Sequence, residues 1–169
     1  MADTEWWQRG PIGGVPAVLQ PVAHILFQVR ESVGEVVIGL TEAEWNARPA
    51  GVASAAFHVR HIAGVIDRLF TYARGEALSD FQRAALAREQ EPAIRLAEVP
   101  TVLADLAGRV DAAVAELKAL DPALLGVWRG VGRAQLPSTT IGCLVHGAEH
   151  AMRHVGQLSV TVRVVRCPP

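Results

Sequence analysis

The sequence has only two cysteines, Cys143 and Cys167, in a chain of 169 residues. The two lie in different sequence contexts, so we expect no disulfide framework and a reducing, cytoplasmic location. The first dozen residues mix acids, tryptophans and a Gly-Pro pair, where a signal peptide would have a basic start and then an apolar run. We therefore expect no signal peptide.

The sequence also lacks an excess of charge of either sign. It has 16 Lys and Arg against 17 Asp and Glu, for a formal net charge of −1, and the basic residues are spread along the chain. Because nucleic-acid binding needs a concentration of positive charge, we expect no nucleic acid as a partner. Charges, His, Gly or Pro interrupt every long apolar stretch, so we expect no membrane-spanning helix.

Half of the residues are hydrophobic, which is enough to bury the core of one ordinary domain. Apolar residues recur at steps of three and four, the period of a helix with one buried face. This pattern predicts four long helices, over residues 15–40, 54–75, 101–120 and 140–164. Four long amphipathic helices favour an all-α fold, a four-helix bundle. We expect an irregular N-terminal arm over residues 1–14, a single helical domain over 15–165 and a C-terminal tail over 166–169.

The connections between the long helices are of mixed length. Thr41 resembles the cap of a short helical piece, and the polar connector 76–100 has room for a short helix over 80–88. Residues 124–136 are consistent with a small hairpin or a plain loop. Residues 160–165 alternate as a strand would, so a β-rich tail remains an alternative to the end of the fourth helix.

Three histidines follow one another at four-residue steps in the last predicted helix: His146, His150 and His154. Cys143 and Gln157 extend the same polar stripe. Two imidazoles four residues apart on a helix can bind one metal ion, whereas the outer two are separated by about 12 Å of helical rise. Spacing alone therefore allows either His146 with His150 or His150 with His154.

A further imidazole is expected from another helix. The second predicted helix has His58 and His61 three residues apart, and the apolar residues near His61 place it toward the interior. His24 on the first helix is a more distant candidate and is interpreted more simply as a surface residue. A single helical histidine is usually an ordinary hydrogen-bonded residue, and Cys143 is equally typical of a small core residue. Repetition on two helices is what favours a metal site.

The sequence resembles the DinB-like (YfiT-like) superfamily of metal-binding four-helix bundles, over about residues 15–165. Three segments carry the resemblance: SAAFHVRHIAG from Ser54, YARG from Tyr72 and EHAMRHVGQL from Glu149. The most specific part is the pattern His-x-x-x-His-x-Gly-Gln in the last segment. The resemblance is to this superfamily and not to the DNA polymerase that shares its name.

The resemblance implies a site with three histidine ligands, His61, His150 and His154, for a divalent ion such as zinc or nickel with open positions for water or substrate. It leaves His146 as a residue of the pocket wall, with His58, Cys143 and Gln157 beside it, and Gln157 in a position to orient a ligand or a bound water. It also implies a homodimer. Members characterised as enzymes are similar to transferases that use a low-molecular-weight thiol, or to related isomerases.

Two functions follow from this reading. The first is a metal-dependent transferase or hydrolase acting on a small molecule, because an open metal position lowers the pKa of a bound thiol or water. The second is a non-catalytic helical dimer that binds a metal or small ligand as a sensor or for structure. A shell completed by Cys143 or Glu149 would favour the second, and an open coordination position would favour the first.

Overall fold

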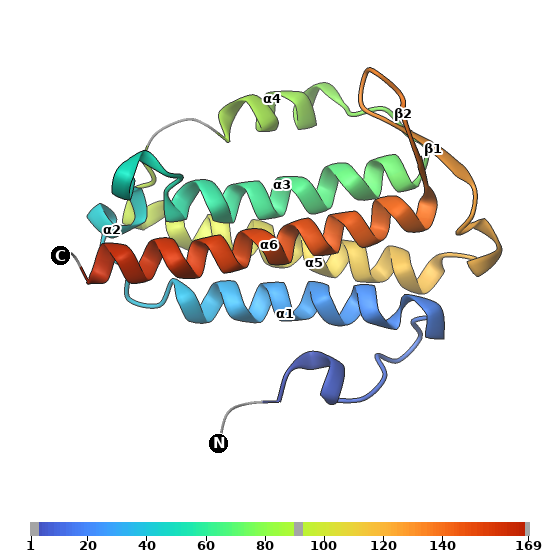
Figure 1. The fold of residues 1–169 in the computed structure, drawn as a ribbon, viewed down its shortest axis with the longest axis horizontal. Helices are drawn as coiled ribbons and strands as arrows, with labels where there is room; N and C mark the ends of the chain where they lie inside the picture. The colour runs from blue at the N-terminus through green and yellow to red at the C-terminus, as the bar shows by residue number, and fades with distance from the viewer. Residues whose placement is uncertain (1–3, 90–92, 168–169) are drawn as a thin grey trace.

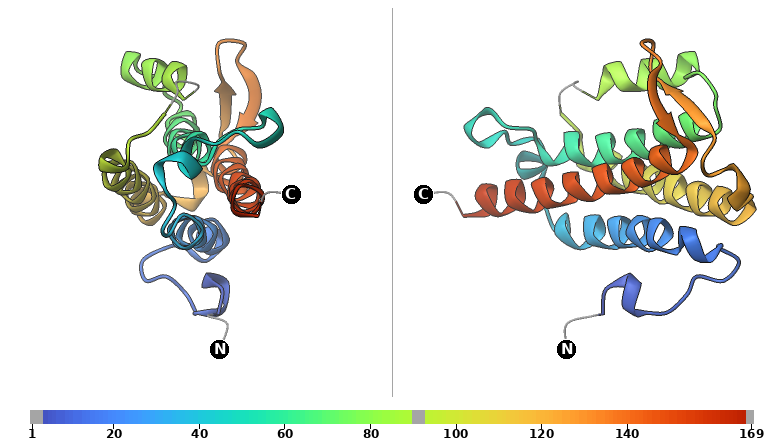
Figure 2. Two further views of the ribbon diagram at one scale, coloured as in Figure 1. Left: turned by 90° about the vertical axis from the view of Figure 1, so that its left-hand side faces the viewer. Right: turned by 45° about the vertical axis from the view of Figure 1, so that its right-hand side comes forward.

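The computed structural model describes residues 4–89 and 93–167, and four long helices lying side by side form its framework (Figure 1). The four are α1 (Gln20–Val36), α3 (Ala55–Ala73), α5 (Val99–Ala119) and α6 (Thr140–Arg166). Viewed end-on, α1 lies opposite α3, and α5 lies opposite α6 (Figure 2). The predicted all-α class is confirmed.

Two short α-helices, one hairpin and five single-turn 3-10 helices complete the described fold; the 3-10 helices are Trp6–Gln8, Ala17–Leu19, Pro49–Gly51, Leu96–Glu98 and Pro122–Leu124. The helix α2 (Glu42–Asn46) follows the Thr41 cap and α4 spans Asp80–Arg88, both where short helices were predicted. Helix α4 covers the outer side of α3 (Figure 1). The strands β1 (Trp128–Val131) and β2 (Leu136–Thr139) pair antiparallel, so the segment left open as hairpin or loop is a hairpin.

Polar caps fix the starts of the two helices that carry most of the histidines. The Ser54 hydroxyl accepts a hydrogen bond from the backbone N–H of Phe57 at the start of α3. The Thr139 hydroxyl accepts one from the N–H of Gly142 at the start of α6. Because each cap satisfies a backbone donor that has no partner within the helix, it determines where the helix begins and hence which face each histidine occupies.

The two helices approach each other closely at Gly147. A Cβ added there would lie 3.1 Å from the Cβ of Leu69, which is tighter than ordinary van der Waals contact. Among the described elements, α3 and α6 share the most extensive interface. The close approach brings His61 of α3 opposite His150 of α6.

Several predicted boundaries were wrong by a few residues. The helix α1 begins at Gln20 and not near residue 15, because Pro21 has no N–H to donate and fits only in a first turn. It ends at Val36, before Gly39 at a φ of 68°. The helix α5 begins at Val99, with Pro100 in its first turn.

The C-terminal region is helical as far as Arg166, so the strand alternative for residues 160–165 is wrong. Leu158 and Val162 are buried on the core side of α6, and this packing outweighs the preference of the β-branched residues for strands. Residues 168–169 of the predicted tail lie outside the described residues. No described helix has both the length and the apolar character needed to cross a membrane.

Candidate metal centre

Three histidines meet between α3 and α6. One ring nitrogen from each of His61, His150 and His154 lies within 4.8 Å of the other two. The closest pair is His61 Nε2 and His150 Nε2, at 3.1 Å, and the ring centroids of His61 and His154 are 4.3 Å apart. Of the two pairs that spacing allowed on α6, His150 and His154 are the pair that joins His61.

The donor geometry of the closest pair fits a single metal ion. Zinc binds imidazole nitrogen at about 2.0–2.1 Å, so two nitrogens on one ion lie about 2.9–3.4 Å apart at bond angles between octahedral and tetrahedral. The separation of His61 Nε2 and His150 Nε2 is 3.1 Å, within this interval. Without a proton or a cation between them, their lone pairs would face each other. Three imidazoles are also ligands that zinc and nickel accept well.

Two of these histidines are held in the form that binds metal. Burial, and then the neighbouring His61 and His150, lower the pKa of His154 to about 4. Burial and the same His61, followed by His146, also lower the pKa of His150. Both rings are therefore neutral at pH 7, and their lone pairs are available to a metal without displacement of a proton.

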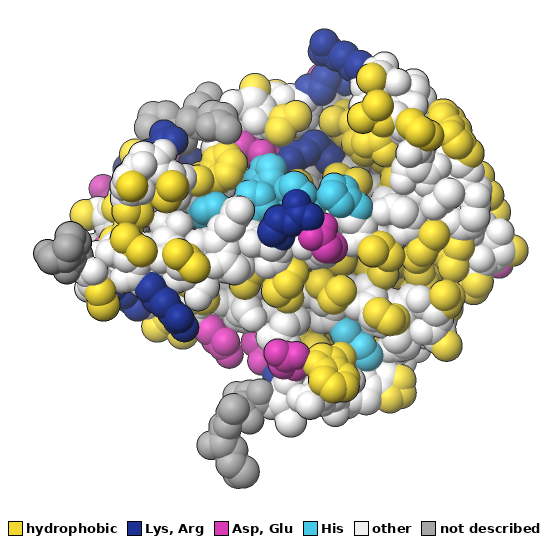
Figure 3. Space-filling view, in the orientation of Figure 1, with side chains coloured by type: hydrophobic (Ala, Val, Ile, Leu, Met, Phe, Trp, Pro, Cys, Tyr) yellow, Lys and Arg dark blue, Asp and Glu magenta, His cyan; other side chains and the backbone are white. Residues whose placement is uncertain are grey.

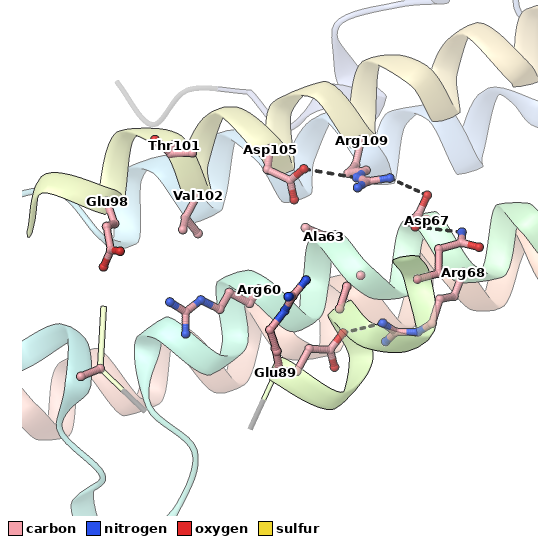
Figure 4. A pocket seen from close by; sticks show the side chains of 15 residues that line it. Arg60, Ala63, Asp67, Arg68, Glu89, Glu98, Thr101, Val102, Asp105 and Arg109 are labelled. Atoms are coloured by element: carbon pink, nitrogen blue, oxygen red, sulfur yellow. Dashed lines mark hydrogen bonds and ion pairs between the residues drawn. The ribbon is translucent and has the colours of Figure 1, made fainter. Parts of the chain in front are cut away.

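The other nitrogen of His61 contacts a carboxylate. His61 Nδ1 lies 2.7 Å from Oε2 of Glu89, the residue that follows α4, and Oε1 of the same carboxylate accepts a hydrogen bond from Arg68 at 2.5 Å. Figure 4 shows the Arg68–Glu89 pair beside a cavity bounded by α3, α4 and α5. Sequence analysis missed Glu89 and Arg68. Glu89 lies in a polar connector with no recognisable spacing, and its role depends on where α4 packs.

His58 supports the centre from the buried side. Its side chain is 4% exposed, and its Nδ1 lies 3.0 Å from Nδ1 of His154. Burial, and then the nearby His61, lower the pKa of His58 to about 4, so the ring is neutral at pH 7. One of the two nitrogens therefore donates and the other accepts. This contact places His58 beside His154, on the buried side of the three clustered histidines.

The profile of the DinB superfamily matches residues 25–158, about four-fifths of the chain. The chain belongs to the DinB superfamily. The match includes all of α3 and the part of α6 as far as Leu158, and so contains all three clustered histidines. No curated protein matches the chain.

At the rim of this DinB-superfamily site, His146 and Glu149 face solvent. The side chain of His146 is 54% exposed, its ring lies edge-on to that of His150, and its Nδ1 is 3.5 Å from Oε2 of Glu149. Glu149 also accepts a hydrogen bond from Arg153 Nε at 3.0 Å, and this contact is the first cause of its lowered pKa. Glu149 and Arg153 thus form a surface ion pair next to His146, the predicted pocket-wall residue.

Three other candidate residues of this DinB-superfamily protein lie apart from the three clustered histidines. Cys143 is 1% exposed and belongs to the apolar core. Gln157 is exposed, and none of the side-chain hydrogen bonds found among the described residues involves it. His24 Nε2 lies 3.0 Å from the carbonyl oxygen of Gly10 and so contacts the N-terminal arm. None of the three is placed to ligate an ion at the centre.

The lowered pKa of His58 predicts a pH-dependent stability. An ordinary histidine has a pKa of 6.5, so between pH 6.5 and 4 the unfolded chain binds a proton at this position that the folded chain does not. The free energy of unfolding must therefore fall as the pH falls through this window. From about pH 7 to 4.5, we expect metal-free protein to lose about 2 kcal/mol more stability than His58→Gln. Urea unfolding at both pH values measures this, and equal losses would show that His58 is not held neutral.

Proposed function

We propose that this protein is an enzyme that uses a divalent ion, zinc or nickel, held by His61, His150 and His154. The ion would activate a low-molecular-weight thiol or a water molecule for attack on a small molecule. The observation that carries the proposal is the number of residues that could ligate one ion. Three histidines cluster, and no further Cys, Asp or Glu of the described residues joins them. Catalytic zinc sites have three protein ligands and an open position, whereas structural sites have four.

The alternative, a closed site in a sensor or structural dimer, has less support. It would need a fourth protein ligand, and the two residues considered for that position are engaged elsewhere. Cys143 is packed in the apolar core, and the carboxylate of Glu149 faces Arg153. Figure 3 supports access from solvent, since histidine side chains reach the molecular surface at the centre of the face viewed there.

The residues around the centre have separable tasks in this proposal. A bound ion would supply Lewis acidity, which lowers the pKa of a thiol or water at the open position. His58 orients His154 from the buried side. Phe57 stacks on His61 with ring centroids 5.2 Å apart and an interplanar angle of 12°, so it shields one ring face from water. His146, at the exposed rim, is placed to exchange protons with solvent.

A cavity of about 770 Å³ lies between α4 and the hairpin, and none of the three clustered histidines lines it. Its lining includes three arginines from these elements, Arg83, Arg129 and Arg133, and one acidic residue, Glu76. Tyr72 and Trp128 add aromatic surface. Helix α4 borders this cavity and is followed directly by Glu89, the partner of His61.

The test uses protein purified without an affinity tag and loaded with zinc or nickel. We expect it to consume a low-molecular-weight thiol in the presence of an electrophilic acceptor, to lose this activity on chelation and to recover it when metal is returned. His61→Ala, treated identically, should be inactive. Metal binding without thiol transfer or hydrolysis across a panel of thiols, acceptors and esters would support the non-catalytic alternative.

We also propose a homodimer formed through helix faces, in the reducing cytoplasm where free thiols are available. Two apolar side chains exposed one turn apart on α6 support this: Val160 and Val164 are 63% and 47% exposed. Exposed apolar residues on one helix are typical of an association surface when they are contiguous. Analytical ultracentrifugation should give twice the chain mass of 18.1 kDa. A monomer at all concentrations would contradict the dimer.

A further inference from the structure

We propose that Glu89 is a positioning residue for the metal centre and that Gly64 is a glycine because Glu89 occupies the space over it. Glu89 does not itself belong to the nitrogen cluster, and it acts through His61. The inference deepens the proposed metal site and rests on it. Its structural part, the protonation of His61, can be tested without metal.

The first step is the protonation of His61. A neutral imidazole carries one N–H, and its other nitrogen is an acceptor. Nδ1 of His61 lies 2.7 Å from a carboxylate oxygen that can only accept, so the proton is on Nδ1 and is donated to Glu89. Nε2 is then unprotonated, and this is the atom that lies 3.1 Å from His150. Glu89 thereby selects the form of His61 in which Nε2 can bind an ion.

The second step is the placement of the carboxylate. Glu89 is 6% exposed and lies at the C-terminal end of α4, where the helix dipole disfavours a negative charge. A buried carboxylate is costly unless it is paired, and Arg68 pairs with Oε1. Arg68 does not use both oxygens, however. Oε2 is left for His61, so the carboxylate connects the buried arginine to the histidine.

The third step is Gly64, which lies between His61 and Arg68 on one face of α3. A Cβ added at Gly64 would clash with Oε1 of Glu89 and lie 2.5 Å from Nη1 of Arg68. Glycine within a helix is destabilising relative to alanine, so this position needs a reason. The reason is contact: the ends of the paired Arg68 and Glu89 side chains lie directly on the backbone of α3, and a Cβ at position 64 would force both ends to shift.

Helix α4 is held in the register that this contact requires. Its N-terminus is capped by Ser79, whose hydroxyl accepts from the N–H of Gln82. The side-chain amide of Gln82 donates to Asp67 at 2.9 Å and to Thr71 at 2.7 Å, both on α3. These bonds fasten the first turn of α4 to α3, and Glu89 at the other end reaches His61.

The experiment compares zinc affinity, by competition with a chromophoric chelator, in Gly64→Ala, Glu89→Gln and Glu89→Ala. We expect each to bind zinc roughly 10–100-fold more weakly than the unaltered protein, the range typical when the partner of a ligand histidine is lost. Gly108→Ala is the matched control. Gly108 is an exposed glycine within α5 with no atom within 4 Å of its added Cβ, and we expect an unchanged affinity.

A second readout separates positioning from general destabilisation. In metal-free protein, nitrogen NMR of His61 should show a proton on Nδ1, and Glu89→Ala should shift the proton toward Nε2. Circular dichroism checks that each variant is folded. If Gly64→Ala does not fold, the isosteric Glu89→Gln still tests the inference. Unchanged zinc affinity and unchanged His61 protonation in folded Glu89→Ala would overturn the inference. If the unaltered protein binds no zinc but carries the His61 proton on Nδ1, the proposed metal site is contradicted, whereas the contact between Glu89 and His61 is supported.

Discussion

Replacing His150 with alanine should lower the affinity for zinc by at least about 100-fold, more than the loss of a hydrogen-bonding partner of a ligand costs. His150 provides one of only three nitrogens in the cluster, and its Nε2 forms the closest approach to His61. With two imidazoles left, the remaining positions would be filled by water, which binds zinc less strongly than imidazole does. Competition with a chromophoric chelator, at pH 7 and without a tag, measures the change.

His146→Ala is the control for this variant. His146 lies one turn away on the same helix, but its side chain is 54% exposed and it is not in the nitrogen cluster. We expect its zinc affinity to stay close to that of the unaltered protein. Zinc at 100 times its dissociation constant should also stabilise the unaltered protein by about 2.7 kcal/mol, and His150→Ala at the same zinc concentration by much less. Equal losses in the two variants would contradict the ligand assignment.

Replacing Arg68 with alanine should lower the free energy of unfolding by about 3–5 kcal/mol. The side chains of Arg68 and Glu89 are only 8% and 7% exposed, so the substitution would leave a carboxylate buried without its cation. His61 remains beside it but is partly exposed and shares its other nitrogen with the metal centre. Urea unfolding of metal-free protein measures the loss.

Removing both charges together should cost less than removing one. In Arg68→Met with Glu89→Gln, no buried charge remains and most of the packing volume is kept, so we expect a smaller loss than for Arg68→Ala. The loss of unfolding free energy in Arg68→Ala should also be nearly the same at high salt, because salt screens a buried ion pair only weakly. If the double variant were less stable than Arg68→Ala, the buried charge would not be the cause of the loss.

Much of the framework could be predicted from the sequence because it depends on local chemistry. The three-to-four periodicity located all four long helices, and Ser54 marked the start of α3. Helix α4 was predicted at its observed bounds, Asp80–Arg88. The errors in helix starts fell at prolines, since Pro21 and Pro100 belong to first turns and the helices begin just before them.

The choice among the histidines of α6 could not be made from spacing. Each step of four residues overshoots a full turn by about 40°, so a stripe of this kind drifts around the helix. His154 is consequently turned toward the buried His58, whereas His146 faces solvent. Cys143 and Gln157 are each three residues from the nearest histidine, and a step of three turns back by about 60°, so Cys143 falls on the buried side with His154 and Gln157 on the exposed side with His146. The family resemblance selected His150 with His154, the pair that the structure places beside His61.

The contact between His61 and Glu89 could not be predicted from the sequence. Glu89 is 28 residues from His61 in sequence, and the two meet only because α4 folds back along α3. The glycine at position 64 was part of the resemblance, yet its physical reason lies in the carboxylate above it. Long-range contacts of this kind leave no periodic trace in a single sequence.

X-ray absorption at the zinc edge of tag-free protein loaded with one equivalent of zinc tests the central claim most directly. We predict three imidazole nitrogens at about 2.0–2.1 Å and one light-atom ligand from solvent, replaced by sulfur at about 2.3 Å when a small thiol is added. Fewer than three imidazoles, or sulfur in the shell before any thiol is added, would contradict an open three-histidine centre.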